Sequence, residues 1–242
     1  MTENMEGLLL DDRWAPVTSE LGFLDTEAEH AARAFAAWQG GLLAPRGIAV
    51  EVHPVSGTLE QALSALLPLS SPEPRRHLFL PTRSAWTMYV ENARGGTDAM
   101  SAMSYMAQTL GCRGLRVVAV PNTIRKDKGR YGAVMLEVYG PHRTEWLNYV
   151  RAISVSNDGG RWVFDQFGEP FPFEKLEHYQ ARRVRDRFTF DLLQEYLRHL
   201  GLSPFTEDFY LPEGARAWRV EKTGPVVPVQ KEYTLAQARE DF

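Results

Sequence analysis

Short stretches of apolar residues, either continuous or alternating with polar ones, recur along the chain and predict β-strands. Residues 77–80 form a largely apolar run, and Trp86, Met88 and Val90 alternate with polar residues shortly afterwards. The turn-like residues 81–84 separate the two stretches. We therefore expect the two strands to pair as an antiparallel hairpin.

A second hairpin is predicted around the sequence Ser-Asn-Asp-Gly-Gly at residues 156–160, which separates the strand-like stretches 149–155 and 161–164. The other predicted strands cover residues 48–55, 115–120, 131–139 and, as a candidate edge strand, 218–220. In the strand over 131–139, alternation places four side chains on one face, those of Ala133, Met135, Glu137 and Tyr139.

Apolar residues spaced three or four apart predict helices between these strands. Capping-box patterns at Thr26 and Thr58 indicate two helix starts, and Gly40-Gly41 and Gly111 indicate two helix ends. The predicted helices cover residues 26–40, 58–67, 97–110, 188–200 and 233–239, and the charged segment 174–187 is also expected to be helical. Residues 1–20 show no period and predict an irregular arm, and residues 68–74 predict a loop.

The order of these elements predicts an α+β fold, with a mixed, mainly antiparallel sheet and helices packed on it. Strict alternation of strand and helix is missing, which disfavours a doubly wound parallel sheet. We expect a single domain over residues 1–242, with residues 171–242 as a candidate C-terminal helical subdomain.

Composition narrows the class of protein without identifying its function. Apolar residues make up 44% and charged residues 24% of the chain, which is typical of a globular protein. There is one cysteine, no secretory leader pattern and no apolar run of membrane-spanning length, so we expect a cytoplasmic protein that does not enter a membrane. Charge is uneven: residues 1–60 hold 10 acidic and 3 basic side chains, whereas residues 111–187 hold 9 and 14.

The glycine turn before the predicted helix at 97–110 is the first candidate site, with the residues Asn92, Arg94, Gly95, Gly96, Thr97 and Asp98. Glycines that allow close approach, followed by a helix N-terminus, can hold an anion. However, the lysine of a phosphate-binding loop is missing, and Asp98 would repel an anion. A structural turn is therefore favoured over a binding loop.

Basic side chains at Arg125, Lys126 and Lys128 are the second candidate site, in a turn between two predicted strands. A further basic group follows at residues 182–187. Both could contact phosphate, but acidic residues are interleaved with them and the chain carries a net charge of −4. These features favour a protein partner over nucleic acid.

Motifs for catalysis or metal binding are not apparent. The six histidines are dispersed, and Glu51 with His53 supplies at most two ligands, so we predict no metal site and no cofactor. Neither serine-hydrolase nor β-lactamase spacing occurs. The oligomeric state cannot be deduced from these patterns.

Three functions from different classes remain. The first is a non-catalytic bacterial module that binds and regulates or neutralises another protein, as immunity and adaptor proteins do; the bacterial source is inferred only from the alanine- and arginine-rich sequence. The second is an enzyme whose site is assembled from dispersed residues, centred on the turn from Arg94 to Asp98 and on Glu51 and His53. The third is a nucleic-acid-binding protein that uses the basic segments. The absence of catalytic motifs favours the first.

Overall fold

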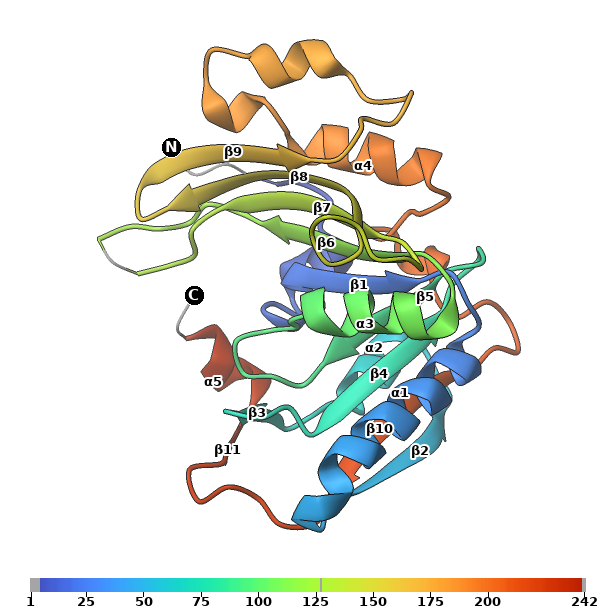
Figure 1. Ribbon diagram of the computed structural model, residues 1–242. Coiled ribbons are helices and arrows are strands. Elements are labelled where there is room, and N and C mark those ends of the chain that lie inside the picture. Colours follow the sequence, from blue (N-terminus) through green and yellow to red (C-terminus); the bar gives the residue numbers. More distant parts are fainter. Residues whose placement is uncertain (1–4, 127, 241–242) are drawn as a thin grey trace.

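One large antiparallel sheet organises the chain (Figure 1). The computed structural model describes residues 5–126 and 128–240. Nine strands form the sheet in the order β2-β10-β4-β5-β1-β6-β7-β8-β9, and every neighbouring pair is antiparallel. These strands are β1 (Glu20–Leu24), β2 (Ala49–Val55), β4 (Arg76–Pro81), β5 (Thr87–Glu91), β6 (Gly114–Val120), β7 (Ala133–Tyr139), β8 (Tyr149–Asp158), β9 (Arg161–Phe167) and β10 (Ala217–Thr223). A separate two-stranded sheet pairs β3 (Leu69–Ser71) with β11 (Lys231–Tyr233).

Helices cover both faces of the large sheet and divide the core into two layers. On one face α1 (Ala28–Leu43) and α3 (Met100–Leu110) pack around Phe35, Phe79, Tyr89 and Met103. The other face is covered by α2 (Leu59–Ser64), α4 (Phe190–His199) and α5 (Leu235–Arg239). Within the described residues, no helix combines the length and apolar character needed to cross a membrane.

The connections show how the sheet is assembled. Strand β1 lies between β5 and β6, so α3 carries the chain from β5 across β1 to β6. Gly22 on β1 allows the close approach of α3, because a Cβ there would lie 2.8 Å from the Sδ of Met103. Likewise, β10 lies between β2 and β4, so residues from the end of the chain complete a sheet that residues near its beginning started.

Most of the predicted architecture is confirmed. The fold is α+β with a mainly antiparallel sheet, and it contains 29% helix and 31% strand. Both predicted hairpins form, as β4–β5 and β8–β9. The capping box at Thr58 is present at the start of α2, and Gly111 ends α3 with a φ of 64°.

Several local predictions were wrong. The segment 174–187 is not one helix but two short 3₁₀ turns, Leu176–Gln180 and Val184–Asp186, because Glu174 and Tyr179 are held in the core by tertiary contacts. Helix α1 continues through Gly40-Gly41 to Leu43, and its N-cap is Glu27 without a capping box.

The remaining corrections concern strands whose pairing partners are distant in sequence. Strand β1 was not predicted, although it lies near the middle of the sheet. Strand β3 lies within the predicted loop 68–74, because β11 pairs with it. The predicted edge strand at 218–220 is part of β10, which pairs on both sides. Residues 171–242 thus contribute α4 to one face, β10 to the large sheet and β11 to the small one.

Candidate functional site

The glycine turn between β5 and α3 is tightly packed. Gly96 has a φ of +100°, and a Cβ at this position would lie 2.5 Å from the carbonyl oxygen of Pro16. Thr97 is buried, donates a hydrogen bond to the carbonyl of Val17 over 2.9 Å and accepts one from the N–H of Glu91 over 3.2 Å. Gly95 and Asp98 are exposed. The turn therefore seats α3 against the N-terminal segment.

Backbone N–H groups before α3, which a bound anion would need, already have partners within the chain. The N–H of Asp98 donates to Glu91 Oε1 over 3.3 Å, and the N–H of Ala99 donates to Glu20 Oε1 over 2.6 Å. Carboxylates at this position also interact favourably with the positive end of the helix dipole. Internal carboxylates thus take the place that the sequence suggested for an external anion.

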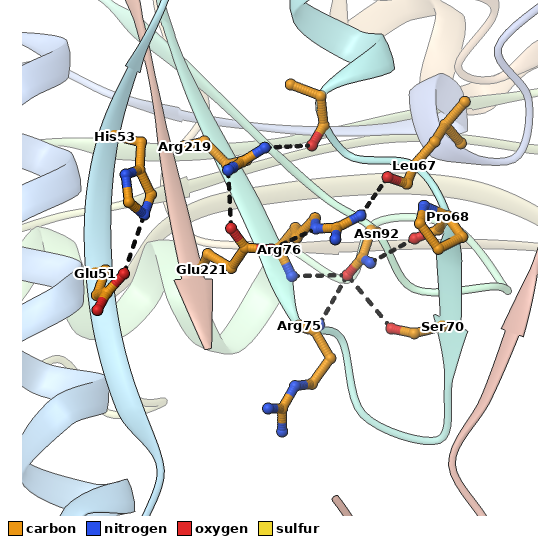
Figure 2. Close-up of polar contacts among 11 residues, drawn as sticks. Glu51, His53, Leu67, Pro68, Ser70, Arg75, Arg76, Asn92, Arg219 and Glu221 are labelled. Carbon is orange, nitrogen blue, oxygen red and sulfur yellow. Dashed lines mark hydrogen bonds and ion pairs between the residues drawn. The ribbon is translucent and has the colours of Figure 1, made fainter. Parts of the chain in front are cut away.

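Asn92 and Arg94 hold the turn to neighbouring segments. The side-chain oxygen of Asn92 accepts the N–H groups of Arg75 and Arg76, each over 2.8 Å, and its amide donates to the carbonyl of Pro68 over 2.8 Å (Figure 2). The guanidinium of Arg94 lies 4.4 Å from the ring centre of Tyr233 on β11. Both contacts account for these residues structurally.

Glu51 and His53 lie on the edge strand β2, with Glu51 Oε2 3.4 Å from His53 Nε2 (Figure 2). Next to them, Glu221 joins Arg76 and Arg219, each over 2.8 Å, in a charge cluster beyond the end of α2. In the part of the chain that the structure describes, no group of three or more His, Cys, Asp or Glu side chains is placed to hold a metal ion.

The basic residues Arg125, Lys126 and Lys128 are exposed at the tip of the hairpin between β6 and β7. Residue 127, which the sequence places among them, lies outside the described residues. Of the second basic group, Arg187 donates to the carbonyl of Ala181 over 3.0 Å and lies over the ring of Phe164. The two groups thus occupy a hairpin tip and the segment that covers β9.

A row of polar side chains, which we call the polar row, crosses the sheet beneath α1 and α3. Its members come from six neighbouring strands, β4, β5, β1, β6, β7 and β8, and are His77, Tyr89, Glu91, Glu20, Arg116, Glu137, Tyr139 and Tyr149.

The inner end of the polar row is closed to solvent: His77, Tyr89 and Glu91 are 2%, 1% and 6% exposed. Tyr89 donates to Glu91 Oε2 over 2.7 Å and lies 2.9 Å from His77 Nδ1. Because the only hydroxyl proton of Tyr89 goes to Glu91, His77 Nδ1 carries the proton and Nε2 is a buried lone pair. Burial lowers the pKa of His77, so this histidine is neutral in the folded protein.

The middle of the polar row is an ion cluster. Arg116 on β6 binds both carboxylate oxygens of Glu20 at 2.8 Å and approaches Glu137 at 3.3 Å. Burial alone would disfavour the charged guanidinium, but hydrogen bonds and charge from Glu20 outweigh it and raise the pKa of Arg116. Burial also raises the pKa of Glu20, against the opposing effect of Arg116. Two carboxylates therefore share one arginine.

The outer end of the polar row reaches a pocket. Tyr139 donates to Glu137 Oε2 over 2.5 Å, and its hydroxyl lies 3.4 Å from that of Tyr149. Burial and the neighbouring charge of Glu137 raise the pKa of Tyr139, so its phenol stays protonated. Both Glu137 and Tyr149 line a pocket of about 360 Å³, together with Trp146, Ala152, Ser154, Asp165, Gln166 and Phe167.

One wall of this pocket is the loop from 140 to 148 between β7 and β8, which is pinned to α3. Asn148 is fully buried; its amide donates to the carbonyls of Ser104 and Gly140 over 3.0 and 2.7 Å, and its oxygen accepts the Ser104 hydroxyl over 2.6 Å. Thr144 accepts the N–H of Trp146 over 3.3 Å. These bonds hold the loop that presents the Trp146 ring at the pocket.

The pocket lies on a part of the sheet that α3 leaves uncovered. Helix α3 packs on β1, β6 and β7, whereas α4 packs on the opposite face of β7 (Figure 1). We call the α3-side surface of β8 and β9 the open face. Its side chains are half-buried or exposed, and they are Ala152, Ser154, Ser156, Arg161, Val163, Asp165 and Phe167.

A larger hollow of about 630 Å³ lies near the start of α1 and is lined by Asp25, Glu29 and Trp218, among others. Its carboxylates are partly neutralised, because Asp25 pairs with Arg113 at 2.8 Å and Glu29 with Arg33 at 2.7 Å. The hollow is also lined by Arg216, whereas the residues that line the pocket on the open face combine aromatic rings and carboxylates without a basic side chain. The pocket on the open face is therefore the better candidate for specific recognition.

The open face was not identified from the sequence, although one signal indicated it. In β9, Trp162 and Phe164 pack toward α4, while Val163 and Phe167 are apolar on the opposite face. A strand at the edge of a sheet with apolar residues on both faces indicates that something covers both.

Comparison of the chain with known protein families, curated proteins and solved structures finds no match.

Proposed function

We propose that this chain is a non-catalytic protein-binding module that regulates or neutralises its partner, and that the open face is its binding surface. The observation that carries this proposal is the group of exposed apolar side chains at the open face and its bordering loop. Trp146 is 64%, Leu147 46%, Val163 41% and Phe167 38% exposed. Apolar side chains that gather on one surface mark interaction sites more often than scattered ones do.

The position of this surface in the fold also supports a protein partner. Strand β9 ends the large sheet, and in the described part of the chain α3 packs on β1, β6 and β7, so the open face extends beyond this helix to a sheet edge. Aromatic residues such as Trp146, Tyr149 and Phe167 are enriched in the centres of protein interfaces. The loop that bears Trp146 is held by buried hydrogen bonds of Asn148, so a partner would not have to order it.

Burial argues against catalysis at the inner end of the polar row. A general base must come within hydrogen-bonding reach of its substrate. His77 and Glu91 are at most 6% exposed. The imidazole ring of His77 packs against the rings of Phe35 and Tyr89, with ring centres 4.7 and 6.0 Å away. We therefore assign this end of the row to folding rather than to chemistry.

Affinity purification of the tagged full-length chain from its native host tests the proposal. We expect one stoichiometric partner, whose complex with the purified chain is then measured by light scattering and calorimetry. Val163→Arg places a charge on the open face and should weaken the complex at least about tenfold, since interface centres exclude unpaired charge. Leu42→Arg, at an exposed residue near the end of α1, is the matched control and should bind like the wild type.

Two results would contradict the proposal. One is the absence of a stoichiometric partner under conditions in which the chain is expressed and folded. The other is a partner that binds the Val163→Arg and wild-type chains with equal affinity.

A further inference from the structure

The pocket beside Trp146 has the chemistry of a site for an organic cation. We propose that it receives a basic side chain, arginine or lysine, presented by a partner protein. This inference rests on the proposed function and specifies the anchor residue that the open face recognises. Its evidence comes from the pocket's rings, charges, size and rigidity.

Three aromatic rings line the pocket: those of Trp146, Tyr149 and Phe167. Tyr149 and Phe167 pack edge to face, with ring centres 6.4 Å apart and planes at 76°. A cation over the face of such rings is attracted by their electron density, and tryptophan gives the strongest attraction. Apolar methylene groups of a long basic side chain would also bury against these rings.

Carboxylates at the pocket give this aromatic site a negative charge. Glu137 and Asp165 are among the eight described residues that line the pocket, and none of these eight is a lysine or arginine. Behind the pocket, Arg116 is held by Glu20 at 2.8 Å and by Glu137 at 3.3 Å. Glu20 and Glu137 thus share one guanidinium and Asp165 adds a further carboxylate at the pocket, which leaves the site negative and disfavours an anionic ligand.

The two carboxylates are held differently, and this decides which one can be tested. Glu137 accepts the hydroxyl of Tyr139 and contacts Arg116, so its replacement would disturb the core. Asp165 is exposed on β9 and accepts the N–H of Gln166 over 2.9 Å. Its charge can therefore be removed with little effect on folding.

The size and rigidity of the pocket fit one long side chain. Its volume of about 360 Å³ is near the lower end of the range for small-ligand sites. The floor consists of the paired strands β7, β8 and β9, and Asn148 fixes the loop that supplies Trp146. A rigid site loses little conformational entropy on binding, which favours its use as an anchor.

Capped tripeptides with a central arginine or lysine are the probes, and matched peptides with citrulline or norleucine are their neutral controls. The readout is the indole N–H resonance of Trp146 in a titration followed by NMR, assigned by its loss in Trp146→Phe. We expect at least one charged peptide to shift this resonance and to bind at least about threefold more tightly than its neutral counterpart. The inference is overturned if neither charged peptide shifts it, or if the neutral peptides bind equally well.

Asp165→Asn is the charge variant, and Glu177→Gln, an exposed carboxylate in the turn segment Leu176–Gln180, is its matched control. We expect Asp165→Asn to weaken the binding of the charged peptide at least about twofold, and Glu177→Gln to leave its affinity unchanged. Equal behaviour of the two variants would overturn the assignment of the pocket. If partner binding is weakened by Val163→Arg but not by Asp165→Asn, the proposed function stands and only the cation pocket is rejected.

Discussion

Arg151 on β8 and Glu174 form an ion pair that is removed from solvent, with side chains 1% and 0% exposed. The guanidinium contacts both carboxylate oxygens, at 2.9 and 2.6 Å, and donates to the carbonyls of Phe167 and Gly168 at 3.1 and 2.9 Å. Glu174 also accepts the hydroxyl of Tyr179 over 2.7 Å. This pair attaches the segment after β9 to the sheet, on the side opposite the open face.

Replacing either partner leaves a buried charge without its counter-ion. We expect Arg151→Met or Glu174→Gln to lower the free energy of unfolding by about 3–5 kcal/mol. For a domain of 150–250 residues, 1 kcal/mol corresponds to roughly 2–4 °C in Tm, so the expected loss is roughly 6–20 °C. The double variant should lose clearly less than the sum of the single losses, because it leaves neither charge unpaired.

Urea denaturation followed by circular dichroism gives these values, with calorimetry to confirm the Tm. The exposed pair Arg33–Glu29 is the control: its side chains are 61% and 47% exposed, and Arg33→Met should cost less than about 1 kcal/mol. A loss below about 1 kcal/mol for Arg151→Met, or strictly additive losses in the double variant, would refute the reasoning about this buried pair.

Two further predictions concern the segment around α3 and the polar row. Gly96→Ala should destabilise the fold by about 2 kcal/mol, because the φ of +100° at Gly96 and the nearby Pro16 carbonyl both oppose a Cβ. The control Gly95→Ala should change stability by less than about 0.5 kcal/mol. Chemical denaturation of both variants measures the difference. Because burial lowers the pKa of His77, the unfolded chain takes up a proton first as pH falls through the usual value of 6.5, and stability is lost below it. His77→Gln should therefore show a smaller loss of unfolding free energy between about pH 7 and pH 5 than the wild type, and an unchanged loss would contradict a neutral buried His77.

Local signals in the sequence were reliable where neighbouring residues determine the structure. The capping box at Thr58 satisfies helix N–H groups within four residues, and the turn at 156–160 joins adjacent strands. Alternation also placed Glu137 and Tyr139 on the same face of β7, which is the face that carries the polar row.

Function-bearing features depended on residues that are distant in sequence. The turn from Asn92 to Asp98 was correctly recognised as the entry to a helix, but nothing near it in sequence indicates that Glu20 would supply a carboxylate to its N–H groups. Trp146 and Phe167 attract little attention separately, because single apolar residues in loops and edge strands are common. Only the pairing of β8 with β9 brings them to one pocket.

By itself the sequence determined the α+β class, both hairpins and the faces of individual strands, since these follow from side-chain periodicity and turn chemistry over a few residues. The tertiary structure decided the place of β1 and β10 within the sheet, the polar row and the uncovered surface of β8 and β9. Strand β1 has only five residues, including a glycine, and its own propensity is weak. It becomes a strand because β5 and β6 pair with it on both sides, and such pairing depends on contacts that no local pattern contains.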